Sequence, residues 1–145
     1  MTHPMIEVLH LPVSHIEALR EAAAAAYPDE CCGLLVGEGA AALTVTEVIP
    51  VLNVAETPER AFAIDPQKQF DVLRATRGTD RRVIGHYHSH PNGHAIPSAR
   101  DLAMAHDPAA VWVVVGITAG GVSEMRAFVC PAGAPAFVEV PIDAG

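Results

Sequence analysis

The sequence has few basic residues, with 9 Lys and Arg against 17 Asp and Glu and a formal net charge of −8. Binding to a nucleic-acid backbone or to an anionic membrane surface needs clustered Lys and Arg side chains. The composition therefore argues against both kinds of partner, and we expect neither nucleic acid nor a membrane to be bound.

Long hydrophobic runs are also missing. The clearest apolar run, Val111 to Ile117, is far shorter than the ~20 residues that a helix needs to cross a bilayer. The N-terminal sequence Met1-Thr-His-Pro has no basic region followed by an apolar stretch, which a secretory signal would have. We therefore expect a protein that stays in the cytoplasm.

Cysteine is scarce, and its placement excludes two structural roles. An odd count of three cannot form a closed disulfide framework. The adjacent pair Cys31 and Cys32 cannot supply the Cys-x-x-Cys unit of a structural zinc site. We interpret the cysteines as small buried apolar groups in a reducing cytoplasm, so any metal must be held mainly by His and carboxylate side chains.

The chain has 145 residues, half of them apolar, with Gly and Pro scattered between periodic segments. This is the usual size for one domain with its own core, and we expect a single domain over residues 1–145. Ser14 and Glu17 predict a capping box at the start of a helix that reaches about Tyr27. Asp65 followed by Pro66 predicts the start of a second helix.

The remaining elements complete a pattern of alternating strands and helices. The second helix should run through about Arg77, and a third, capped by Ser98, should run to His106. Apolar and alternating segments predict strands at residues 6–11, 32–37, 43–49, 82–90, 111–117, near 123–130 and at 136–142. This order predicts an α/β protein with a mixed β-sheet flanked by helices.

Histidines are concentrated in one region, with five of the eight between His86 and His106. Residues two apart on a strand project from the same face, so His86, His88 and His90 should point the same way. Burying several imidazoles together without partners would cost roughly a few kcal/mol. A metal ion can offset this cost by accepting their lone pairs.

A carboxylate and a second acid complete a candidate catalytic set. Asp101 lies three residues after Ser98, on the same face of the predicted helix that follows the histidine strand. Two imidazoles and one carboxylate are the three protein ligands of a typical catalytic zinc, which keeps a fourth position for water. Hydrolysis also needs a group that takes and returns a proton, and Glu30, just before the apolar segment 32–37, is our candidate.

Each of these patterns has an ordinary alternative. A His-x-His pair is frequent on strands without any metal, Ser98 with Asp101 is also a plain capping box, and Glu30 is an ordinary acid in a connection. We favour His86 as a histidine that packs beside the ligands. A zinc-binding protein without hydrolytic activity, which uses His86 as a third ligand with His88 and His90, stays open.

The combined pattern is Glu, a long gap, His-x-His, seven residues, Ser, two residues and Asp, which this chain fills with Glu30, His88, His90, Ser98 and Asp101. It resembles the zinc motif of the JAMM (MPN+) metalloprotease family. The resemblance implies that His88, His90 and Asp101 bind Zn²⁺ and that Glu30 is the general acid/base. Ser98 would donate a hydrogen bond to the oxyanion of the tetrahedral intermediate.

The segments around the motif, residues 27–37 and 85–91, resemble the short prokaryotic members of that family, and the resemblance spans nearly the whole chain. It implies a fold similar to that of the cytidine deaminases. Members cleave amide or isopeptide bonds at the C-terminal tail of ubiquitin or of ubiquitin-like sulfur-carrier proteins. Because this chain leaves little room for insertions that grip ubiquitin, a smaller β-grasp sulfur carrier is the expected substrate.

The main alternative is a non-catalytic MPN-type module for protein–protein interaction, as occurs in members that have lost the metal ligands. The intact motif argues against it. The sequence leaves open whether the chain forms a homodimer, which residue follows the scissile bond, and what His94 does in the loop beside the ligands.

Overall fold

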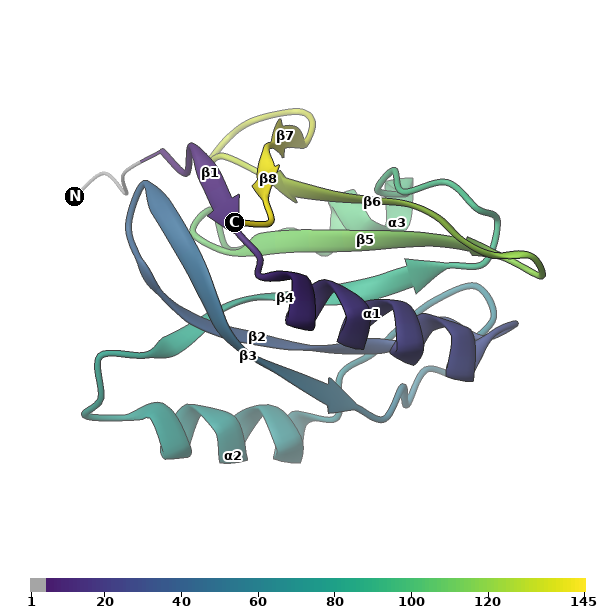
Figure 1. The fold of residues 1–145 in the computed structure, drawn as a ribbon, viewed down its shortest axis with the longest axis horizontal. Coiled ribbons are helices and arrows are strands. Elements are labelled where there is room, and N and C mark those ends of the chain that lie inside the picture. The colour runs from purple at the N-terminus through teal and green to yellow at the C-terminus, as the bar shows by residue number, and fades with distance from the viewer. Residues whose placement is uncertain (1–4) are drawn as a thin grey trace.

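The computed structural model describes residues 5–145, so the prediction made from Met1-Thr-His-Pro lies outside the described residues. None of the helices in this described part is long and apolar enough to cross a membrane. The elements follow one another as β1 (Val8–His10), α1 (Val13–Ala26), β2 (Cys32–Gly39), β3 (Ala42–Val51), α2 (Pro66–Thr76), β4 (Arg82–His90), α3 (Ala99–Ala103), β5 (Val111–Thr118), β6 (Gly121–Val129), β7 (Val138–Val140) and β8 (Ile142–Asp143) (Figure 1).

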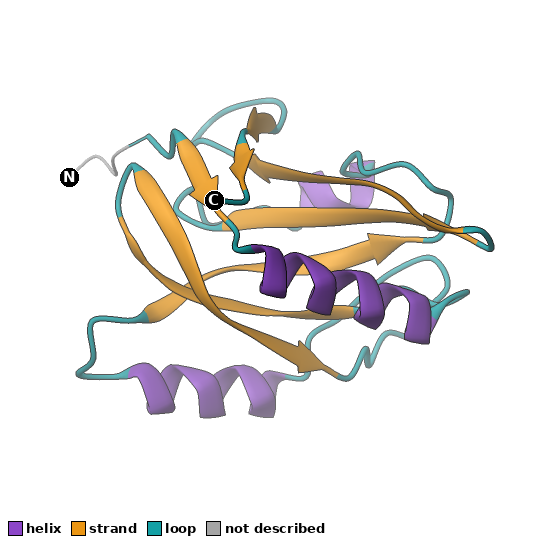
Figure 2. Cartoon of the chain, viewed as in Figure 1, coloured by secondary structure: helices purple, strands orange, loops and turns teal. Residues whose placement is uncertain are grey.

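The strands form one mixed sheet in the order β7-β6-β5-β4-β2-β3-β1-β8. The pairs β4 with β5, β1 with β3 and β1 with β8 are parallel, and the other neighbours are antiparallel. Helix α1 lies in front of the sheet and α3 lies behind it, and Figure 2 distinguishes the helices (purple) from the strands (orange) in the same view. The predicted α/β architecture, a mixed sheet flanked by helices, is confirmed.

The two ends of the strand order, β7 and β8, are consecutive in the chain and separated only by Pro141. The sheet must therefore curl until its two edges come together near Pro141 (Figure 1). Pro141 has no N–H for the ladder, which explains why the single strand expected over residues 136–142 is in fact two short ones.

Successive residues of the central strands alternate between two faces of the sheet. The larger core includes Leu19 of α1, Tyr87 of β4 and the odd-numbered residues Val111, Val113, Val115 and Ile117 of β5. His86, His88 and His90 of β4 alternate with Tyr87 and so project from the opposite face, away from α1. That opposite face therefore carries the histidine row, in the middle of the sheet rather than at an edge.

The capping box expected at Ser14 and Glu17 is wrong. Helix α1 begins at Val13, with Pro12 as its N-cap and no capping bond from a side chain. The backbone N–H of Leu11 still pairs with β8, so the helix starts directly after the strand and Ser14 falls inside its first turn. By contrast, the start of α2 is confirmed, since the Asp65 carboxylate accepts a hydrogen bond from the N–H of Gln67 at 3.1 Å.

Helix α3 is shorter than expected and ends at Ala103 rather than at His106. Pro108 follows closely, and a proline ring clashes with the carbonyl four residues earlier and disfavours helical geometry in the residue before it. The interpretation of cysteines as buried apolar groups is confirmed for Cys32 and Cys130, whereas Cys31 is half-buried; all three are free thiols.

Candidate metal centre

Three buried side chains converge where β4 ends and α3 begins. The Nε2 atoms of His88 and His90 lie 3.0 Å apart, and Asp101 Oδ2 lies 3.1 Å from the first and 3.2 Å from the second. Ligand atoms held at about 2.0–2.1 Å by a tetrahedral zinc ion stand roughly 3.3 Å apart. The three atoms thus have the spacing of ligands around one ion.

The tautomer of His90 also fits a metal ligand. Its Nδ1 lies 3.2 Å from the carbonyl oxygen of His94. A carbonyl oxygen only accepts hydrogen bonds, so Nδ1 carries a proton, and Nε2 is the nitrogen whose lone pair would face the centre once it gives up its own proton to make room for a metal ion. Histidines that bind metal usually donate from the second ring nitrogen in this way.

The charge states of the three side chains are those expected of metal ligands. Burial lowers the pKa of His88 and favours its neutral form. Burial also opposes ionisation of Asp101, but the hydrogen bonds with His88 and His90 outweigh it and hold the Asp101 pKa well below its ordinary range. Burial disfavours the charged form of His90 too, yet its bond to Asp101 raises the His90 pKa overall. An arriving metal ion would displace the proton that this pair holds.

Helix α3 fixes the carboxylate of Asp101. The Ser98 hydroxyl accepts from the Asp101 N–H at 3.0 Å, while Asp101 Oδ2 accepts from the Ser98 N–H at 2.8 Å. This pair is a capping box. One carboxylate therefore both closes the start of the helix and faces the two imidazoles, so the capping and the ligand interpretations of this motif are compatible.

Glu30 reaches the centre from the connection between α1 and β2. One of its carboxylate oxygens lies within 4.8 Å of ligand nitrogens of His88 and His90. Its backbone N–H donates to the Pro58 carbonyl at 2.7 Å, and its carbonyl accepts from the Asn53 side-chain amide at 2.9 Å. Burial raises the pKa of Glu30 to about 7. A carboxyl group with this pKa can both take and return a proton near neutral pH.

The raised pKa predicts a stability cost for ionised Glu30 in the metal-free protein. Because the folded state binds this proton more tightly than the unfolded chain, the free energy of unfolding should fall as pH rises from about 4.5 to about 7. We expect metal-free Glu30→Gln to exceed the wild type in stability at pH 8 by about 1–2 kcal/mol, after allowance for solvent screening. Urea unfolding at pH 8 and near pH 4 measures this difference, which should vanish at the lower pH. Equal stabilities at pH 8 would contradict it.

Sequence reasoning missed several side chains that support the centre. The Ser89 hydroxyl accepts from the Cys31 N–H at 2.7 Å and so ties the residue after Glu30 to β4. The Phe62 ring stacks on His88, with centroids 4.2 Å apart and an interplanar angle of 18°. Only Ser89, which lies inside the His-x-His motif, had a signal in the sequence. Phe62 and Asn53 lie in connecting segments, where neither residue type carries a sequence signal for a metal centre.

His86 is set apart from the other two histidines of its row. Its ring packs edge-on against Trp112, with centroids 4.2 Å apart. Over residues 5–145, the group of His, Cys, Asp and Glu whose ligand atoms all lie within 4.8 Å of one another is Glu30, His88 and His90. Asp101 lies outside that group but contacts both imidazoles directly, whereas among these described residues no such contact is made by His86. The geometry thus favours His86 as a packing neighbour of the ligands.

The centre opens into a groove. A hollow of about 550 Å³ is lined by Glu30, His90, His94 and Ser98 among others. A second hollow of about 410 Å³, with an apolar wall that includes Phe137, shares residues 96–98 with the first. The two hollows therefore meet at Ser98, beside the candidate metal centre.

The family of the chain follows from comparison with known proteins. A model of the prokaryotic homologues of the JAB domain matches residues 12–131. The chain belongs to this family. The sequence-based resemblance to JAMM proteins is thereby confirmed, and the matched range of the JAB homologue contains all five residues of the motif.

Three named proteins illustrate what this JAB homologue is similar to. A desampylase from Haloferax volcanii is 40% identical over 95 residues, which are 66% of this chain and 68% of that protein. A probable TtuB-protein conjugate cleaving protease from Thermus thermophilus is 33% identical over 126 residues, 87% of this chain and 78% of the relative. The CysO-cysteine peptidase of Mycobacterium tuberculosis is 31% identical over 124 residues, 85% and 83% of the two chains.

The fold of the JAB homologue agrees with a solved structure of the wider family. A JAB1/MPN domain protein from Archaeoglobus fulgidus superposes with a TM-score of 0.54 and 18% identity, covering 96% of this chain and 98% of the other. At this identity the likeness concerns the fold alone, and it confirms the predicted JAMM/MPN fold class.

Proposed function

We propose that this JAB homologue is a zinc-dependent peptidase that hydrolyses an amide or isopeptide bond at the C-terminal tail of a ubiquitin-like or sulfur-carrier protein. The convergence of His88, His90 and Asp101 on one point, with Glu30 beside it, carries the proposal. The relatives support the reaction class, since their names describe a desampylase, a conjugate-cleaving protease and a peptidase.

His88, His90 and Asp101 would hold the ion. Two imidazole nitrogens and one carboxylate oxygen suit zinc, and a three-ligand set keeps a coordination position free for the reaction. When bound there, the ion supplies Lewis acidity, which polarises the scissile carbonyl and lowers the pKa of water toward ~7.

Glu30 moves the proton. In this proposal its carboxylate takes a proton from the attacking water and returns it to the departing amine nitrogen. The pKa of about 7 suits both halves of this transfer. The hydrogen bonds of its backbone to Pro58 and Asn53 fix the position from which the side chain acts.

Ser98 donates to the developing oxyanion. Its hydroxyl oxygen already accepts from the Asp101 N–H, so the hydroxyl proton is left for the substrate. Loss of one oxyanion donor lowers kcat by about 10²–10³-fold, and loss of a cap costs about 1 kcal/mol. We expect both effects in Ser98→Ala. Ser98→Thr, which keeps the hydroxyl, should retain most of the activity and stability.

Steady-state kinetics and urea unfolding of the two Ser98 variants separate these effects. If Ser98→Ala lost stability but kept the wild-type kcat, Ser98 would cap α3 without taking part in the reaction.

The tail of a carrier protein is the proposed substrate because it is narrow and flexible enough to lie in the groove. The hollows that meet at Ser98 allow the substrate chain on both sides of the scissile bond to contact the protein.

The test is to incubate the zinc-loaded protein with β-grasp carrier proteins of the same genome, extended at the C-terminus, and to follow trimming by mass spectrometry. Trimming by the wild type and not by Glu30→Gln is expected. If no extended carrier were cut, the proposed substrate class would be wrong.

A further inference from the structure

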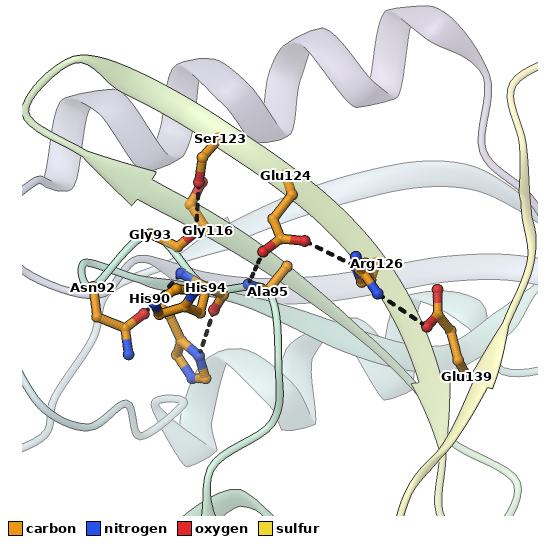
Figure 3. Close-up of polar contacts among 10 residues, drawn as sticks. All are labelled: His90, Asn92, Gly93, His94, Ala95, Gly116, Ser123, Glu124, Arg126 and Glu139. Atoms are coloured by element: carbon orange, nitrogen blue, oxygen red, sulfur yellow. Dashed lines mark hydrogen bonds and ion pairs between the residues drawn. The ribbon is translucent and has the colours of Figure 1, made fainter.

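The loop between β4 and α3, residues 91–98, is fastened to the β5–β6 hairpin (Figure 3). The Ser123 hydroxyl lies 2.5 Å from the carbonyl oxygen of Gly93 and 3.1 Å from that of Gly116. A Cβ atom added to Gly116 would stand only 2.5 Å from the Gly93 oxygen. The loop therefore rests directly on the backbone of β5.

One peptide group of this loop is hydrogen-bonded on both sides. Its carbonyl, which belongs to His94, accepts from His90 Nδ1 at 3.2 Å, and its N–H, which belongs to Ala95, donates to Glu124 Oε2 at 3.2 Å (Figure 3). The carbonyl and the N–H are parts of one conjugated planar unit. The carboxylate of Glu124 and the imidazole of His90 are thus linked through a single amide.

We propose that Glu124 is a positioning residue for His90 and acts through the His94–Ala95 peptide. A negative charge at the N–H polarises the amide and strengthens its carbonyl as an acceptor, because hydrogen bonds in a chain reinforce one another. The stronger bond at Nδ1 holds the tautomer whose Nε2 faces the metal centre and makes that nitrogen a better ligand. Carboxylates that contact a ligating histidine directly have the same effect.

The neighbours of Glu124 keep its carboxylate ionised and hold it against the Ala95 N–H. The Ala95 N–H and the Arg126 guanidinium together hold the Glu124 pKa below its ordinary value. Arg126 Nε donates to Glu124 Oε1 at 2.8 Å, and Arg126 also contacts Glu139 Oε1 at 3.3 Å. Ala95 is fully buried, so its N–H depends on Glu124 for a partner. Glu139 binds the same arginine, and its carboxylate accepts no hydrogen bond from the His94–Ala95 peptide, which makes it a matched control.

Four variants test the inference, which rests on the proposed metal site. Glu124→Ala removes both acceptor and charge, and Glu124→Gln keeps an acceptor but removes the charge. Glu139→Ala removes the other carboxylate of the network. Ser123→Ala releases the loop at Gly93 and leaves the His94–Ala95 peptide bonded.

Two readouts are measured, the zinc dissociation constant by competition with a chelator and the NMR signals of the His90 ring in the metal-free protein. Glu124→Ala should raise the dissociation constant about 10-fold and weaken the Nδ1–H hydrogen bond, seen as an upfield shift of that proton. Glu124→Gln should show a smaller change of both, and Glu139→Ala should match the wild type.

Wild-type zinc affinity and an unshifted His90 proton in Glu124→Ala would overturn the inference. So would an equal shift in Ser123→Ala or Glu139→Ala, because the effect would then come from loosening of the loop in general. Failure of the wild type to bind zinc would instead overturn the proposed function, while the metal-free NMR comparison would still test the link between Glu124 and His90.

Discussion

Glu30→Gln is expected to lower kcat for amide hydrolysis by about 10³-fold while the bound zinc stays at the wild-type level. The amide is close in shape to the carboxylate but cannot take a proton from water, and general acid–base catalysis contributes about 10²–10⁴-fold. Carrier trimming and metal analysis of the same preparations provide the two measurements.

Glu59→Gln is the matched control for this substitution. Glu59 is an exposed acid that lines the same groove but takes no part in the proposed proton transfer, so its loss can change KM for the tail and should leave kcat near the wild-type value. Full activity of Glu30→Gln would refute the proposed proton transfer. Loss of zinc in this variant would instead make Glu30 a ligand, a role that its distance from His88 and His90 also permits.

Asp101→Asn is expected to weaken zinc binding by about 10²-fold or more. An asparagine can still accept from the Ser98 N–H and close the capping box, but its neutral amide is a poor zinc ligand. The substitution therefore removes the proposed ligand and keeps the helix start. Changes in residues that only support a ligand cost 10–100-fold, so loss of a ligand itself should reach or exceed that range.

His86→Ala is the comparison that separates Asp101 from the alternative ligand set. With His86 packed against Trp112, this variant should keep its zinc. If Asp101→Asn retained wild-type affinity and His86→Ala lost it, the ion would be held by the three histidines of β4. Chelator competition on the two variants decides between these sets.

The fold was predictable where local signals agree with the tertiary structure. The run of β-branched residues in β5, the cap at Asp65 and the cap at Ser98 each lie where the sequence predicts them. The errors arise where the rest of the sheet overrides a local signal, as at Ser14, or where a proline ends an element early, as at Pro141.

The candidate site was predictable only as a joint pattern. Neither His88-Ser89-His90 nor Asp101 is informative alone, and Glu30 lies far from both in the sequence. The link between Glu124 and His90 could not have been found in this way. It passes through backbone atoms of the His94–Ala95 peptide, and backbone atoms have no signature in a sequence.

The site also concentrates polar groups that reduce stability. Glu30, His88, His90 and Asp101 are all buried on one face of the sheet, where hydrophobic side chains would cost less to desolvate. Such an arrangement is expected where function rather than stability selects the residues. The stability difference proposed for metal-free Glu30→Gln measures one part of that cost.

The account depends on one ion being shared by His88, His90 and Asp101. A crystal of the zinc-loaded protein, with data collected at the zinc absorption edge, locates the ion directly by its anomalous scattering. The account predicts a single strong peak about 2.0–2.2 Å from His88 Nε2, His90 Nε2 and an Asp101 carboxylate oxygen, with Glu30 beside it but unbound. A peak bound by His86, or one that lies away from Asp101, would contradict it.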